Sequence, residues 1–165
     1  MMQVQLKRRR ERLRQAAVVI CFVFLLTPAA IPATKKLAVV VSAGSKLSDI
    51  PLAALISLCK GVQKALPDGR SFTLVIKDPE SPEMRSAAQV LFGAAPADIK
   101  SLIGKLNESR MFVHVVENED ELLHTVESTP GAVGIVYVYS INASVKVLRV
   151  DGKLPFDVGY PLRGN

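Results

Sequence analysis

The side chains most often used in catalysis and metal binding are few in this sequence and widely separated. His114 and His124 are the two histidines, and neither has a second His or a Cys at metal-site spacing. Cys59 lies in the apolar run LISLC, which predicts a buried thiol rather than a nucleophile. The acidic cluster at 117–121 is more simply explained as the first turn of a helix. With no phosphate-loop or nucleophile-elbow motif either, we expect no enzyme activity, metal or cofactor.

Polar residues also gather at one predicted helix start. Ser81 suits the N-cap, Pro82 the first helical position, and Glu83 the positive end of the helix dipole. The pattern predicts a helix over 82–92, followed by Gly93. The free N–H groups of a helix start can attract a tetrahedral oxyanion, but capping alone explains these residues equally well.

Charge is distributed unevenly along the chain. The formal net charge is +6, but residues 1–15 hold six of the 21 Lys and Arg and one of the 15 Asp and Glu. The rest of the chain therefore has 15 basic and 14 acidic residues. A nearly neutral domain offers no broad positive surface to a polyanion, so we expect no nucleic-acid partner.

The first 33 residues have the organisation of an export signal. A basic start at 7–14 (KRRRERLR) precedes an uncharged apolar run at 16–26, and small residues follow up to Ala33. The apolar run makes only about 16 Å of helix, short of a hydrocarbon core of roughly 30 Å. We expect residues 1–33 to be a signal peptide that delivers the domain to the periplasm. The alternative is an uncleaved anchor in the inner membrane that faces the periplasm, and the Sec and twin-arginine routes both stay open.

The remaining sequence alternates between apolar runs and amphipathic segments. Strands are predicted at 37–41, 72–76, 111–116, 132–137 and 145–150. Helices are predicted at 51–60, 82–92, 97–106 and about 117–128. This alternation predicts one α/β domain over 34–152, with a mainly parallel sheet flanked by helices. Proline and glycine recur in 153–165, which predicts an irregular C-terminal tail.

Three segments, taken in order, resemble the phosphate-specific periplasmic binding proteins of ABC transporters. The segment 49–61 (DIPLAAL through Gly61) is similar to a family helix that closes with a glycine. The turn at 67–69 (PDG), a strand and the segment 81–93 are similar to the family's strand and its Ser-Gly-Thr phosphate loop. The segment 129–136 (TPGAVGIV) is similar to a "pGAIGYv" strand entry, and VKVL follows at 145–148. The resemblance covers about 37–150 and implies one lobe of a type II periplasmic-binding-protein-like fold.

The same resemblance implies a ligand and a set of contacts. The family has a basic residue shortly before its Ser-Gly-Thr loop, and Lys77 and Ser81 match that residue and the loop serine. The implied ligand is inorganic phosphate or a similar oxyanion, and the implied partner is a membrane transporter. The expected anion contacts are Lys77, Ser81 and Arg85, with Gly44, Ser45 and Lys46 as a candidate second rim.

Differences from the family pattern keep a second hypothesis open. Pro82 and Glu83 stand where the family has glycine and threonine, which removes one amide donor and adds negative charge. The chain also resembles one lobe, so another envelope protein or a second copy would have to supply the missing half. The first hypothesis is an oxyanion-binding module connected with an ABC transport system. The second is a periplasmic interaction or accessory module that kept the fold and lost the anion.

Overall fold

Strands and helices alternate along the part of the chain that the structure describes. The computed structural model describes residues 36–93, 95, 98–108 and 113–162, so the predicted leader lies outside it. The strands are β1 (Leu37–Ser42), β2 (Asp49–Ile50), β3 (Thr73–Lys77), β4 (Val113–Val116), β5 (Ala132–Tyr137), β6 (Val145–Val147) and β7 (Arg149–Val150). The helices are α2 (Leu52–Cys59), α3 (Pro82–Phe92), α4 (Ile99–Glu108), α5 (Glu119–Ser128) and the 3-10 helix η2 (Val138–Ser140). Within these ranges, no helix combines the length and the apolar character needed to span a bilayer.

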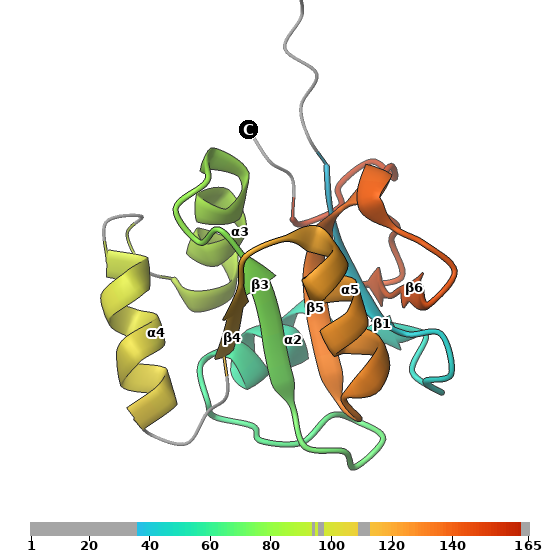
Figure 1. Cartoon of the computed structure of the whole chain (residues 1–165), viewed down its shortest axis with the longest axis horizontal. Helices are drawn as coiled ribbons and strands as arrows, with labels where there is room; N and C mark the ends of the chain where they lie inside the picture. Colours follow the sequence, from blue (N-terminus) through green and yellow to red (C-terminus); the bar gives the residue numbers. More distant parts are fainter. Residues whose placement is uncertain (1–35, 94, 96–97, 109–112, 163–165) are drawn as a thin grey trace, which may run out of the picture. The chain divides into compact units, whose positions relative to one another are not determined.

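One five-stranded sheet, in the order β4-β3-β5-β1-β6, forms the centre of the domain (Figure 1). β4, β3 and β5 run parallel, whereas β1 pairs antiparallel with both β5 and β6. Four strands therefore share one direction, and β1 alone opposes them. The predicted α/β class with a mainly parallel sheet is confirmed. The reversed β1 brings Leu37 opposite Tyr137, at the carboxyl end of β5.

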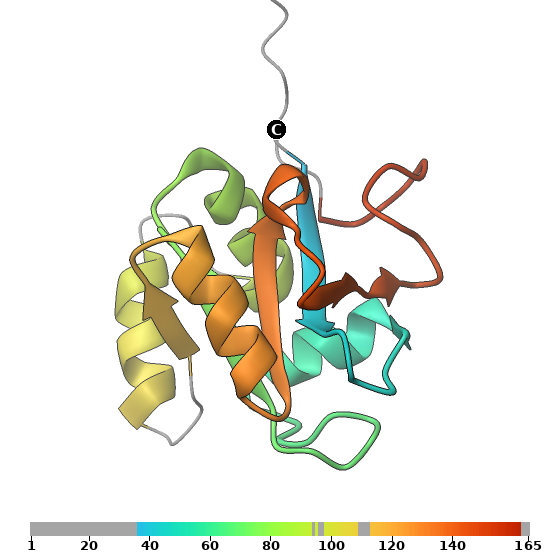
Figure 2. The same ribbon diagram turned by 45° about the vertical axis from the view of Figure 1, so that its right-hand side comes forward.

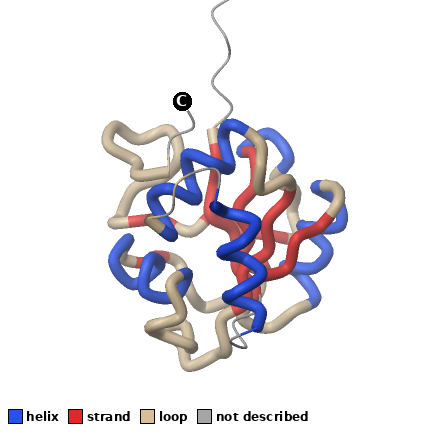
Figure 3. The backbone as a smooth tube through the Cα atoms, turned by 90° about the vertical axis from the view of Figure 1, so that its left-hand side faces the viewer, coloured by secondary structure: helices blue, strands red, loops and turns tan. Residues whose placement is uncertain are grey.

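The helices cover both faces of this sheet. α5 packs on one face, while α2 and α3 pack on the other, so the strands lie between helices in a side view (Figures 2 and 3). A cluster of buried hydrophobic residues lies on each face of the sheet, and successive β1 residues alternate between the two clusters, as the pleat of a strand requires. Leu37 and Val39 face α2 and α3, whereas Ala38 and Val40 face α5. The continuous apolar run at 37–41 is thus explained by burial on both faces, as predicted.

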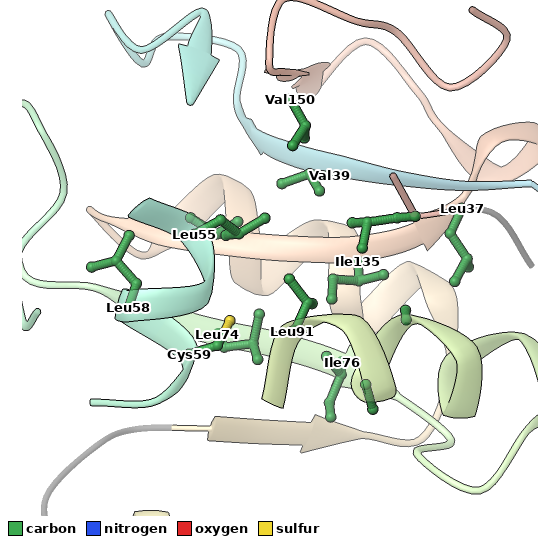
Figure 4. Packing of buried hydrophobic residues seen from close by; sticks show 14 of the residues in the cluster. Leu37, Val39, Leu55, Leu58, Cys59, Leu74, Ile76, Leu91, Ile135 and Val150 are labelled. Atoms are coloured by element: carbon green, nitrogen blue, oxygen red, sulfur yellow. The ribbon is translucent and has the colours of Figure 1, made fainter. Parts of the chain in front are cut away.

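The larger core packs α2 and α3 against the sheet (Figure 4). Leu55 and Leu58 of α2 and Leu91 of α3 are fully or almost fully buried there. Cys59 is buried as well, and this burial raises the pKa of its thiol to about 12. The thiol therefore stays protonated and packs as a small hydrophobic group, in agreement with the sequence analysis.

The C-terminal part of the chain departs from the predicted elements in two ways. The predicted strand at 145–150 is divided, because β6 pairs with β1 and β7 pairs with β2. Between them, the Leu148 N–H donates to the Val39 carbonyl at 2.8 Å. Residues 153–162 contain no helix or regular strand, but Tyr160 and Leu162 are only 2% and 1% exposed. Tyr160 and Leu162 therefore anchor the end of this irregular segment in the core, while residues 156–159 are exposed.

A residue from the C-terminal region caps α2. Pro51, the N-cap residue, makes no side-chain capping bond. Instead the Asp151 carboxylate accepts a hydrogen bond from the Leu52 N–H at 2.8 Å, across 99 residues of sequence. In return, the Gly152 N–H donates to the Asp49 carboxylate at 3.1 Å. These two bonds tie the small β2-β7 sheet to the start of α2.

We predict that Asp151→Ala lowers the free energy of unfolding by about 1 to 2 kcal/mol, because α2 loses its cap. Asp151 has a φ of 52°, in the left-handed region, and asparagine tolerates this region well. Asp151→Asn keeps an oxygen acceptor and should lose less than half as much. Urea unfolding followed by circular dichroism measures both changes. An alanine variant as stable as the parent would contradict this account of the cap.

Gly134 allows α5 to approach β5 closely. A Cβ atom there would lie 2.8 Å from Val126, 2.9 Å from Leu122 and 3.0 Å from Val40. We predict that Gly134→Ala destabilises the domain by about 1 to 3 kcal/mol through overpacking. The matched control is Gly104→Ala, since Gly104 is exposed within α4 and a Cβ there meets nothing within 4 Å. That control should gain about 0.5 to 1 kcal/mol from helix propensity, and a thermal melt of each variant distinguishes the two outcomes.

Candidate functional site

A pocket of about 580 Å³ opens where β3 and β5 end and where α3 and α5 begin. Ligand sites of open α/β sheets lie at the carboxyl ends of strands, which makes this pocket the strongest candidate site of the described domain. The reversed β1 contributes its first residue to the same place. The lining residues are Leu37, Lys77, Asp78, Glu80, Ser81, Pro82, Glu83, Met84, Glu119, Ile135 and Tyr137.

The start of α3 forms one side of the pocket. The predicted cap is confirmed: the Ser81 hydroxyl accepts a hydrogen bond from the Met84 N–H at 3.3 Å. The Ser81 carbonyl accepts another from the Arg85 N–H at 2.9 Å, and Pro82 has no N–H to offer. Of the first four residues of α3, this leaves only Glu83 with an amide available to a ligand. The helix start is therefore a weak anion site.

Negative charge dominates the pocket. Four carboxylates line it, from Asp78, Glu80, Glu83 and Glu119, against the single ammonium of Lys77. These five side chains give a formal net charge of −3. Among the described residues, no carboxylate is found within ion-pair distance of Lys77. An entering anion would meet one favourable charge and four unfavourable ones.

Two of these carboxylates are held by hydroxyl groups. The Tyr137 hydroxyl donates to Glu83 at 3.1 Å, and the Ser140 hydroxyl donates to Glu119. Partial burial is the main cause that raises the pKa of Tyr137, and the charges of Glu83 and Glu119 raise it further. A hydrogen bond with Ser81 acts in the opposite direction. The phenol therefore stays protonated at neutral pH and remains a donor to Glu83.

The structure brings together two of the residues that the sequence analysis selected. Lys77, at the end of β3, and Ser81, at the start of α3, both line the pocket. Arg85 is exposed on α3 and is not among the lining residues.

The candidate second rim, formed by Gly44, Ser45 and Lys46, lies away from the pocket. β1 runs against β5, so its last residues lie near the start of β5, with Val41 opposite Val133. The segment 44–46 therefore follows β1 at the end of the sheet that is opposite the pocket. Ser45 is buried there, and its hydroxyl accepts a hydrogen bond from Arg70 at 2.6 Å. The reversed direction of β1 thus separates this segment from Lys77 and Ser81.

Tyr137 and Glu119 also line the pocket, although neither was predicted as a site residue. Tyr137 ends a predicted strand, and Glu119 begins the helix that follows another strand. The rule that ligands bind at the carboxyl ends of parallel strands would have pointed to both positions. Neither of the two histidines lines the pocket. Across the described ranges, no cluster of three or more His, Cys, Asp or Glu side chains has the arrangement of a metal site.

Comparison with known proteins identifies the fold. No protein-family model and no curated sequence matches the chain. An ABC-type phosphate transport receptor from Vibrio cholerae has a TM-score of 0.56 at 18% identity, covering 73% of this chain and 48% of that one. A putative phosphate ABC transporter substrate-binding protein from Clostridium perfringens, solved with bound phosphate, has a TM-score of 0.57 at 13% identity, covering 73% and 46%. PstS from Borrelia burgdorferi has a TM-score of 0.57 at 17% identity, covering 79% and 55%.

The matched region is only part of each of these structures. The chain spans about half the length of the solved proteins to which it is similar. At this level of identity the similarity concerns the fold. The described domain therefore shares its α/β fold with about half of each of these solved proteins.

Proposed function

We propose that this chain is an exported, solute-binding-protein-like module that acts as an interaction or accessory module of the envelope. The observation that carries this proposal is the formal charge of −3 in the pocket at the carboxyl ends of β3 and β5. The fold provides a binding position, while the side chains at that position disfavour a free anion. A module that kept the fold and changed its ligand accounts for both facts.

The contacts at the pocket support this choice. Lys77 supplies a single point charge, whereas an arginine would supply a bidentate fork for a phosphate or sulfate. Glu83 offers the one available amide of the first turn, but its own carboxylate lies in the same pocket. Four carboxylates share the pocket with the single ammonium of Lys77, so the net local charge disfavours a bound anion.

The expected location and partners follow from two further observations. The basic and apolar order of residues 7–26 supports export to the periplasm, or anchoring on the periplasmic side of the inner membrane. The similar solved structures are described as phosphate receptors of ABC transporters, which supports a role beside a transport system. A membrane transporter or another envelope protein is therefore the partner class that we propose.

Binding of phosphate or a similar oxyanion is the second candidate function. It is favoured by Lys77 and Ser81, which lie together at the pocket, and by the similarity to a substrate-binding protein solved with phosphate. In this case a second copy or another protein would have to cover the open side and add donors. Each charge contact would then gain strength as water is excluded.

Calorimetric titration with phosphate and with sulfate at low ionic strength distinguishes the two candidates. We predict no measurable heat of binding at millimolar anion, because four carboxylates line the pocket beside the single ammonium of Lys77. The double variant Glu80→Gln and Glu83→Gln should bind phosphate more tightly than the parent protein. Micromolar binding by the parent, abolished in Lys77→Ala and kept in Lys100→Ala, would instead establish the oxyanion function. Lys100 is an exposed residue of α4 outside the pocket lining.

A second prediction separates the capping role of Ser81 from an anion-binding role. Ser81→Ala should lower the free energy of unfolding by about 1 kcal/mol, because the Met84 N–H loses its acceptor. The loss should be the same with and without phosphate in the buffer. Chemical denaturation in both buffers measures it, with Ser101→Ala on the exposed face of α4 as the control. A loss that appears only in phosphate would show that Ser81 holds the anion.

A further inference from the structure

The pocket combines an apolar lining with carboxylates nearer the solvent. Leu37, Met84 and Ile135 line it and are 1%, 5% and 3% exposed. Asp78 and Glu80 are exposed, and Glu83 and Glu119 are partly buried. A ligand that fits this arrangement needs an apolar part and a positive end.

We propose that this pocket receives a lysine or arginine side chain of a partner polypeptide. The methylene stem of either residue packs on apolar surface while its charged head reaches polar groups. In this pocket the stem would contact Leu37 and Ile135, and the head would lie among the carboxylates. The inference rests on the proposed function, because it names the class of partner that an accessory module with this pocket would recognise.

Two carboxylates are held in position before any partner arrives. Tyr137 donates to Glu83 at 3.1 Å, and Ser140 donates to Glu119. Each ionised carboxylate has about four acceptor positions, so one hydroxyl bond leaves room for N–H donors of a guanidinium. Because Glu83 and Glu119 are already held, their side chains lose less conformational entropy when a partner binds. The remaining acceptor positions of Glu83 and Glu119 therefore stay available to a cationic group.

Two exposed aromatic rings lie outside the pocket lining. Tyr139, two residues beyond Tyr137, is 77% exposed, and Phe156 is 58% exposed. The ammonium of Lys36 already lies 4.5 Å from the centre of the Phe156 ring. The Lys36 carbonyl accepts a hydrogen bond from the Val138 N–H at 2.9 Å, which links this contact to the segment that carries Tyr139. One face of Phe156 is thus occupied by Lys36, and the exposed Tyr139 ring offers a face to a partner's cation.

Charge complementarity selects this occupant over a second copy of the chain. Two identical pockets that faced each other would each bring a formal charge of −3 to the contact. A basic segment instead neutralises the pocket. The volume of about 580 Å³ lies within the range of small-ligand sites, and it accommodates one long side chain with part of its neighbours.

Fluorescence anisotropy with the protein purified from the envelope fraction tests the proposal. The probes are three labelled alanine-based peptides of one length, which carry two arginines, two citrullines or two glutamates. Citrulline has the shape of arginine without its charge. We expect the arginine peptide to bind, and the other two to bind at least tenfold more weakly. Equal binding of the arginine and citrulline peptides, or no binding of any peptide, would overturn the inference.

Two double variants show whether the pocket is the site of binding. Glu80→Gln with Glu83→Gln should weaken the arginine peptide about tenfold, since two of the four carboxylates lose their charge. The matched control, Glu108→Gln with Glu127→Gln, removes the same charge from exposed positions outside the pocket lining and should change binding by less than about twofold. Similar weakening by both pairs would indicate non-specific attraction and overturn the inference. Circular dichroism melts of all variants verify that each one is folded.

The outcomes keep this inference distinct from the proposed function. If the protein binds neither the peptides nor phosphate, the accessory function is still supported, but a basic partner is excluded. Micromolar phosphate binding removes the accessory function itself. Light scattering over a range of protein concentrations tests for a second copy as the occupant, and a dimer that excludes the arginine peptide would overturn the inference.

Discussion

The antiparallel pairing of β1 with β5 is the contact on which the rest of the domain depends. It fixes which β1 residues face α5 and which face α2 and α3, because side chains alternate along a strand. A shift of one residue would exchange the two sets. The same register brings Leu37 opposite Tyr137, so it also supplies one wall of the pocket. The register between β1 and β5 therefore determines both the packing of the core and one wall of the pocket.

In the pocket, the charges of the side chains act against the backbone donors that the fold provides. Strand ends and a helix start meet at one edge of the sheet, which is where folds of this kind offer backbone donors to ligands. Here Pro82 removes one donor, and Ser81 uses another for its own cap. The side chains then reverse the sign of the local field, from a weakly positive helix end to a net negative surface. Fold similarity alone therefore does not transfer a ligand.

Local sequence signals predicted the local structure well. The structure has the buried strand at 37–41, the N-cap at Ser81 and the helix end at Gly93. Each of these features depends on residues that are neighbours in the sequence. Three other features depend on the order and direction of the strands. These are the split of the predicted strand 145–150 into β6 and β7, the capping of α2 by Asp151, and the position of Ser45 away from the pocket. Those properties are set by contacts between distant parts of the chain, which no short pattern encodes. The pocket was half predicted for this reason: Lys77 and Ser81 are near in sequence, whereas Tyr137 and Glu119 come from other strand ends.

The central place of β1 has a consequence for how the polypeptide acquires its structure. Its two neighbours, β5 and β6, are formed by residues about a hundred positions later, and Asp151 reaches α2 from a similar separation. Such long closures slow folding and require nearly the whole chain to be present. During synthesis the early segments would therefore remain without their partners. The domain therefore acquires its tertiary structure only late in synthesis, once β5 and β6 can pair with β1.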